Sequence, residues 1–278
     1  MGSGSSGYSC STGEGGEVTS RVSGPSAASA VADHPVVEAG ARAGYLVNGV
    51  LHLLVAALGL QVAFGDKGAE ADPKGAMRLV SDTPVGGLVL VAIVAGFVLL
   101  AVWQVSEGIR SRKAADRVKA VGKTLVYLVL AWGAVTILLG GGTSGPAQAK
   151  DATATVMSLP FGQALVGACG LAVIGVGAFH IHKGWTEGFR DDLETSPGRL
   201  LITVGRIGYV AKGVALMAAG GGLVAAAALH DPSRSRGLDG ALRDLVALPF
   251  GQVLVALISI GFAAYGIYSF ARARHAKV

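Results

Sequence analysis

The 278-residue chain is poor in charge, in cysteine and in aromatic residues. Only 15% of its residues are charged and 51% are hydrophobic, a balance that excludes an ordinary soluble domain. Its two cysteines cannot build a disulfide framework, because Cys10 lies in a Gly/Ser-rich tail and Cys169 lies within an apolar run. The apolar residues follow one another without strand-like alternation, which excludes a membrane β-barrel. The composition therefore predicts an all-α membrane protein.

The motifs of familiar membrane enzymes are also missing. The chain has no Gly-x-Ser-x-Gly elbow, no His-Glu-x-x-His pair and no paired carboxylates inside an apolar run. His180 and His182 would point to different faces of a helix, and no further ligand lies nearby in the sequence. We therefore expect no enzyme activity, no cofactor and no metal site. Basic residues flank the apolar runs instead of forming one stripe, so we expect no nucleic-acid partner.

Six apolar runs are each long enough to cross a membrane, since about 20 helical residues span a hydrocarbon core of about 30 Å. They cover approximately residues 43–64, 85–106, 121–142, 161–182, 205–229 and 250–270. Sixteen of the 23 Lys and Arg residues fall on the side of the tail, the second and fourth linkers and the C-terminus. Because basic residues are retained in the cytoplasm, we expect a multi-pass protein of the plasma (inner) membrane with both termini cytoplasmic.

The runs form three copies of a two-helix unit. The stretch Arg206-Ile207-Gly208-Tyr209 aligns without gaps on Arg42-Ala43-Gly44-Tyr45, and Leu-Pro-Phe-Gly-Gln opens the fourth and the sixth run. Such repeats predict related helical hairpins, so we expect six transmembrane helices as three tandem two-helix repeats in a pseudo-threefold bundle. The expected boundaries are 1–38 for a disordered cytoplasmic tail and 39–113, 114–198 and 199–274 for the three repeats.

These motifs give the chain a resemblance to a known family. The tandem Arg-x-Gly-Tyr entry, a basic residue six positions after the Arg, and the Leu-Pro-Phe-Gly-Gln opening resemble actinobacterial membrane proteins that carry domain of unknown function 1206. The resemblance covers approximately residues 41–274 and implies fold and membrane placement, with no established activity. The first repeat departs from the pattern, because Asn48 replaces the lysine and Val85 replaces the phenylalanine.

The proline motif has an expected structural role. A short, partly apolar segment precedes each proline, and we expect it to form a helix of one or two turns in the outer interface. The proline would then occupy the first turn of the next helix, the glycine would permit close packing, and the glutamine would cap or hydrogen-bond near the surface. The residues concerned are Pro84, Pro160, Gly162, Gln163, Pro249, Gly251 and Gln252.

Three polar residues share one repeat position inside the odd-numbered helices: Asn48, Lys123 and Lys212. They could line a polar constriction that favours anions, or they could be snorkelling lysines and a packing contact. One turn deeper lie His52 and Tyr127; His52 could be a proton relay or a buried neutral histidine that donates to a carbonyl. Trp103, Phe179 and Tyr268, near the ends of the even-numbered helices, are expected to form an interfacial aromatic belt.

Two functions remain open. The preferred one is a non-enzymatic structural or partner-binding role, with the lipid bilayer as solvent and a protein partner or a second copy of the chain as possible partners. The alternative is a channel or transporter for a small solute or anion along the repeat axis, gated by the three polar residues. No run is interrupted at mid-membrane as in many transporters, which favours the first.

Overall fold

The structure is a computed structural model and describes residues 35–111, 113–142, 144–193 and 198–275. In those ranges nine α-helices and two short 3-10 helices follow one another. They are α2 (Pro35–Ala63), α3 (Pro73–Ser81), α4 (Gly86–Arg110), α5 (Ala114–Leu138), α6 (Gly145–Met157), α7 (Gly162–Trp185), η1 (Gly188–Asp192), α8 (Arg199–Leu229), η2 (Pro232–Arg234), α9 (Gly237–Val246) and α10 (Gly251–His275). The tail predicted over 1–38 lies outside these ranges up to residue 34. Its last four residues belong to α2, with Pro35 at the first position, where proline fits a helix.

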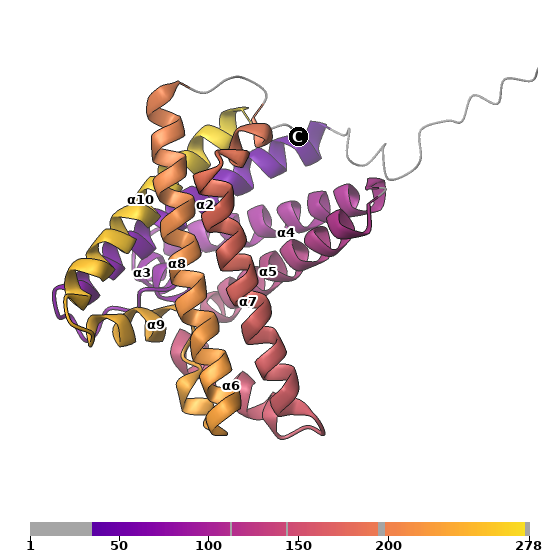
Figure 1. The fold of residues 1–278 in the computed structure, drawn as a ribbon. Coiled ribbons are helices and arrows are strands. Elements are labelled where there is room, and N and C mark those ends of the chain that lie inside the picture. Colours follow the sequence, from indigo (N-terminus) through magenta and orange to yellow (C-terminus); the bar gives the residue numbers. More distant parts are fainter. Residues whose placement is uncertain (1–34, 112, 143, 194–197, 276–278) are drawn as a thin grey trace, which may run out of the picture.

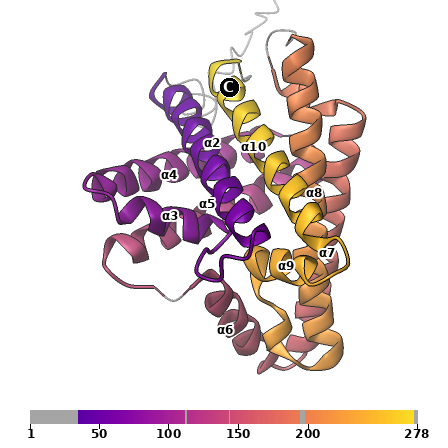
Figure 2. The same ribbon diagram turned by 90° about the vertical axis from the view of Figure 1, so that its left-hand side faces the viewer.

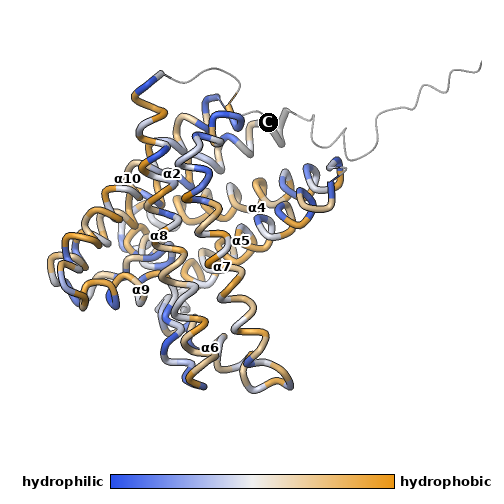
Figure 3. Tube along the Cα trace, in the orientation of Figure 1, coloured by the Kyte–Doolittle hydropathy of each residue, from blue (hydrophilic) through white to orange (hydrophobic). Residues whose placement is uncertain are grey.

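Six of the described helices are long and apolar enough to cross a membrane: α2 from Arg42 onward, α4, α5, α7, α8 and α10. Apolar residues dominate along them, and hydrophilic residues gather near their ends and on the short helices (Figure 3). The six predicted spans are thereby confirmed as helices. The third one differs in extent, because α5 ends at Leu138 instead of near 142. Gly140 follows with φ 73, a left-handed conformation that stops the helix.

The spanning helices form three long pairs, and each pair joins two different repeats. α4 lies along α5, α7 lies along α8, and the last helix, α10, returns to lie along the first, α2. Within repeats, α2 contacts α4 and α8 contacts α10, whereas α5 and α7 have almost no contact. The pair α4/α5 diverges from the pair α7/α8 in both views (Figures 1 and 2). The pseudo-threefold arrangement therefore has one open seam, between α5 and α7.

Glycines allow the close approach of the paired helices. A Cβ on Gly177 in α7 would lie 2.7 Å from the carbonyl oxygen of Gly213 in α8, and one on Gly220 would lie 2.8 Å from that of Gly170. No side chain fits at such distances, so the backbones of α7 and α8 are in direct contact. Without a hydrophobic driving force in lipid, such backbone contact is a main source of helix association.

The predicted interfacial helices are present as α3, α6 and α9, but the prolines do not start the helices that follow. Pro160 lies two residues before α7, and Phe161 takes φ 61; Pro249 and Phe250 repeat this with the same φ. The prediction that proline occupies the first helical turn is wrong, because the sharp reversal is made by the next residue in a left-handed conformation. In the first repeat Val85 has φ −102, as expected of a β-branched residue.

The motif glycine is required by this turn. A Cβ on Gly162 would overlap the carbonyl oxygen of Val156, and a Cβ on Gly251 would overlap that of Leu245. Gln163 donates to the carbonyl of Ala227 (2.6 Å) and so caps the end of α8 from α7. The side chain of Gln252 is exposed.

The end of the bundle that carries α3, α6 and α9 is here called the outer layer. Its three segments are joined in a closed ring by one buried or half-buried contact between each pair of repeats. Lys74 Nζ donates to Gln148 Oε1 (3.0 Å), Thr153 Oγ1 donates to Ser235 Oγ (2.8 Å), and the Ala71 amide donates to Asp239 Oδ1 (2.8 Å). Arg243 Nε donates to the other oxygen of Asp239 (2.8 Å). The outer layer is therefore a closed ring of bonded segments.

Candidate functional site

At the opposite end α4 meets α5, α2 begins and α10 ends (Figure 1). The polar residues at the shared repeat position lie in the first half of α2, α5 and α8. Asn48 and Lys212 are linked through His52. His52 Nδ1 lies 2.8 Å from the carbonyl oxygen of Asn48, and Lys212 Nζ lies 3.3 Å from His52 Nε2. The carbonyl can only accept and the ammonium can only donate, so His52 is a neutral histidine protonated on Nδ1. Asn48 Nδ2 in turn donates to Ser269 Oγ (3.3 Å).

Two cations of this region lie over tyrosine rings. Lys212 Nζ lies 4.1 Å from the centre of the Tyr265 ring, and the Arg272 guanidinium lies 4.4 Å from that of Tyr45, whose hydroxyl accepts from Arg272 (3.0 Å). Such cation–π contacts stabilise partly desolvated charges without neutralising them.

Four aromatic side chains form the wall behind these cations: Phe189, Tyr209, Tyr265 and Tyr268, here called the aromatic cluster. Their rings are stacked or edge-on, with centres 5.2 to 5.3 Å apart for Phe189–Tyr268, Phe189–Tyr209 and Tyr209–Tyr265. Tyr268 is fully buried, and its hydroxyl donates to the carbonyl of Phe189 (2.9 Å). The expectation that Tyr268 belongs to an interfacial belt is therefore wrong, since η1 folds back and covers it. Phe179 does expose about half of its surface (49%).

The charges around the cluster do not balance. Asp192 accepts from Lys183 (2.8 Å), which neutralises that lysine. In the described part of the chain, Lys123, Lys212 and Arg272 form no ion pair with an acidic residue. We call the group formed by Lys212, Arg272, His52 and the aromatic cluster, together with Lys123, the inner site.

Lys123 stands apart from Asn48 and Lys212, the other two residues at its repeat position. Its side chain is exposed and has no hydrogen bond to a described residue. Lys119 lies one turn before it on the same face of α5 and is 5.9 Å from the ring centre of Phe179 in α7, so Lys123 faces the seam. Tyr127 points elsewhere, because its ring stacks on Phe97 (6.0 Å) in the core between α4 and α5. The structure therefore brings Asn48, His52 and Lys212 together and leaves Tyr127 out.

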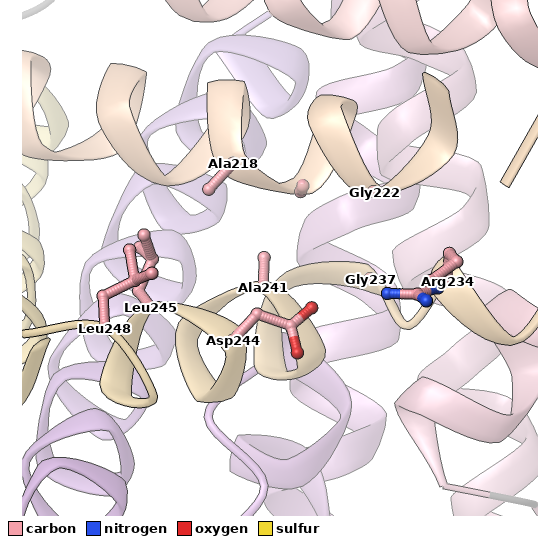
Figure 4. Close-up of a pocket in the computed structure, with 9 residues that line it drawn as sticks. Ala218, Gly222, Arg234, Gly237, Ala241, Asp244, Leu245 and Leu248 are labelled. Atoms are coloured by element: carbon pink, nitrogen blue, oxygen red, sulfur yellow. The ribbon is translucent and has the colours of Figure 1, made fainter. Parts of the chain in front are cut away.

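A hollow of about 260 Å³ lies between α8 and α9 in the outer layer. Its floor is made by small residues such as Ala218, Gly222 and Ala241, with Arg234 and Asp244 at its edge (Figure 4). Both charged residues are already paired, Arg234 with Asp231 and Asp244 with Arg236. No group of three metal-ligating side chains is found within the residues that the structure describes.

Sequence reasoning missed the residues that surround the lysines. Tyr45 and Tyr209 belong to the Arg-x-Gly-Tyr motif and were used only to set the repeat register. Tyr265, Tyr268 and Arg272 are spaced by three and four, which places them on one face of α10. This spacing, read together with the motif tyrosines, was the available signal.

Fold and site together define an integral membrane protein built from tandem helical repeats, with a cationic, aromatic-walled site at one end. The family profile described as Domain of Unknown Function (DUF1206) matches three times, over residues 43–111, 118–187 and 207–276. The chain therefore belongs to this family.

A similar protein is the "Uncharacterized protein YxxB" of Bacillus subtilis (strain 168). It is 29% identical over 248 residues, which cover 84% of this chain and 90% of the relative. No protein of solved structure matches the chain significantly. The resemblance to the family is thus confirmed, and the actinobacterial part of that expectation stays a prediction.

Proposed function

We propose that this protein is a non-enzymatic, multi-pass protein of the plasma membrane that binds a small anion at the inner site. Both termini would lie in the cytoplasm, so that the inner site opens toward the cytoplasmic side. The observation that supports this function is the presence of three cations, Lys123, Lys212 and Arg272, that have no acidic partner among the described residues.

Unpaired cations in a membrane protein need compensation. A charge withdrawn from water costs several kcal/mol unless it is paired, which is why intramembrane ionisable groups mark functional sites. Tyr265, Tyr45 and His52 contribute partial negative charge to Lys212 and Arg272, but they carry no net charge at neutral pH. A bound anion would supply the missing charge and accept hydrogen bonds from both cations at once.

The outer layer argues against the alternative of a conduit along the repeat axis. The contacts Lys74–Gln148, Thr153–Ser235 and Ala71–Asp239 join all three outer segments into one bonded ring at that end of the bundle. An anion bound at the inner site would enter and leave by the same end. The structural or partner-binding role expected from the sequence needs no anion at all, which makes binding itself the deciding measurement.

The test uses the purified full chain in an uncharged detergent, with sulfate as the probe anion. A ligand that binds only the folded state adds about 2.7 kcal/mol of stability at 100 times its Kd, so sulfate should raise the unfolding midpoint well above a chloride control of equal ionic strength. Lys212→Met should abolish this response. Lys150→Met, which removes an exposed lysine from the outer layer, should leave it intact.

A wild-type midpoint that responds to neither sulfate nor phosphate would refute anion binding. The conduit alternative is tested separately in liposomes loaded with an anion-sensitive dye. We expect release no faster than from empty liposomes; release that depends on Lys123 and Lys212 would restore the conduit.

A further inference from the structure

We infer that the anion of the inner site is the phosphate of an anionic phospholipid headgroup, which enters sideways through the seam between α5 and α7. This inference rests on the proposed anion site and names its ligand.

The seam is the first observation. In the first and third repeats the two helices of the hairpin touch, α2 with α4 and α8 with α10, but α5 and α7 have almost no contact. The α4–α5 end and the α7–η1 end also point in different directions (Figure 1). A protein surrounded by lipid cannot leave such an opening empty, and lipid is the molecule that reaches it without crossing any barrier.

The cations at the seam are the second observation. Lys119 and Lys123 are four residues apart and therefore lie on one face of α5. Lys119 Nζ lies 5.9 Å from the ring centre of Phe179 in α7, which places this face of α5 opposite α7. Lys123 has no hydrogen bond to a described residue and is exposed. Lys119 is paired with Asp116 (3.1 Å), so on this face Lys123 is the cation without an acidic partner among the described residues. It lies at the polar end of a span, at the depth of lipid phosphates.

A buried polar atom at the same level is the third observation. Gln104 in α4 is 4% exposed, and its Oε1 has no hydrogen-bond partner. Gly108 lies against Ala120 in the antiparallel pair α4/α5, so one turn further along each helix brings Gln104 to the level of Lys123 and Thr124. At the same repeat position Ser269 is bonded to Asn48. Gln104 thus leaves an unsatisfied acceptor inside the α4/α5 contact, at the level of Lys123.

The seam and its unpaired cation point to an anionic phospholipid, and phosphatidylglycerol is the probe. The experiment measures lipid retained by the detergent-solubilised full chain in native mass spectrometry, with phosphatidylglycerol and phosphatidylcholine of equal chain length. We expect phosphatidylglycerol to be retained preferentially. Because each lysine near a lipid surface is worth about a fivefold change in binding, Lys123→Met should weaken retention about fivefold.

A steric variant tests the route of entry. Val176 precedes Phe179 by three residues on α7, and Lys119 of α5 lies 5.9 Å from the ring centre of Phe179, so Val176 lies on the side of α7 that faces α5. Val176 is half exposed (49%), so Val176→Trp should narrow the seam and lower retention of phosphatidylglycerol at least fivefold. Leu171→Trp is the matched control, because Leu171 is also exposed but lies roughly 140° around the helix from Val176. It should leave retention unchanged.

Free sulfate separates this inference from the proposed function. Sulfate reaches the site from water, so Val176→Trp should keep the sulfate-dependent rise of the unfolding midpoint, which also shows that the variant is folded. Equal retention of phosphatidylglycerol and phosphatidylcholine, together with a sulfate response, would overturn the lipid and keep the anion site. Absence of both responses would overturn the two proposals together. Equal loss of lipid in both tryptophan variants would overturn entry through the seam.

Discussion

The buried Asp239 of the outer layer and the cations of the inner site differ in how fully their charges are paired. In the outer layer Asp239 is almost fully buried (2% exposed) and accepts from both the Ala71 amide and Arg243. Among the described residues, Lys212, Lys123 and Arg272 of the inner site have only aromatic, histidine or hydroxyl neighbours, or no bonded neighbour at all. A charged group whose hydrogen bonds and ion pairs are made within the protein stabilises one arrangement, whereas a charged group without an acidic partner can bind a ligand. On this comparison we assign stability to Asp239 and its partners, and we propose binding for the inner site.

The largest loss of stability is expected when the buried carboxylate of Asp239 is removed from the outer layer. Asp239→Ala removes the acceptor of the Ala71 amide and leaves Arg243 without its carboxylate. Because removal of one partner from a buried pair strands the other, the free energy of unfolding should fall by about 3–5 kcal/mol. The measurement is the unfolding midpoint of the full chain in detergent.

Asp244→Ala is the control in the same helix. Its carboxylate pairs with Arg236, but it is exposed (60%), and such surface pairs contribute about 1 kcal/mol or less. Equal losses in the two variants would contradict the claim that the outer layer is held by its buried contacts.

The second effect concerns the turn that connects α6 to α7. Gly162→Ala places a Cβ against the carbonyl of Val156, and overpacking of this kind costs about 1–3 kcal/mol or more. Gly175→Ala in the same helix has no atom within 4 Å of the added Cβ, so its stability should stay equal or rise slightly through the better helix propensity of alanine. If the two alanine variants have the same unfolding midpoint, packing does not require glycine at position 162.

A smaller effect is a pH dependence in the outer layer. Burial raises the pKa of Asp72 above its usual 3.8, and the nearby Glu70 and Asp239 add to this. A folded-state pKa above the unfolded one means that stability is fully present below about 3.8 and is partly lost as the pH rises through the folded-state pKa.

Asp72→Asn keeps an N-cap acceptor for the Gly75 amide, which Asp72 now binds at 2.8 Å, and removes the charge. The variant should therefore unfold at a higher temperature than the wild type at pH 7, and this advantage should vanish near pH 3.8 or below. An advantage that is the same at both pH values would show that ionised Asp72 is not penalised by burial.

The sequence was sufficient to predict the spans, the repeats and the short outer helices, because apolar length and repeat register are local properties. It was not sufficient for the turn at Pro160, since nothing in Leu-Pro-Phe-Gly-Gln says that Phe161 takes a left-handed conformation. Phenylalanine rarely adopts this conformation. The reversal also requires glycine at position 162, because a Cβ there would overlap the carbonyl oxygen of Val156.

The candidate site was predicted only in part, because its residues come from different repeats. The register singled out Asn48 and Lys212, but their connection through His52 depends on the return of α10 to α2, which no local pattern reveals. The same register treated Lys123 as equivalent, whereas the seam sets it apart. Equivalent sequence positions become unequal when one hairpin of three fails to close.

The smallest change in stability is expected from a substitution at the inner site. Lys212→Met keeps the apolar length of the side chain and loses a cation–π contact with Tyr265 worth about 0.5–2 kcal/mol. It also removes an unpaired charge from a half-buried position, which offsets that loss. The free energy of unfolding without added anion should therefore change by about 1 kcal/mol or less, while the response to sulfate disappears. A loss as large as that of Asp239→Ala would mean that Lys212 stabilises the fold, and the contrast between a structural end and a binding end would no longer hold.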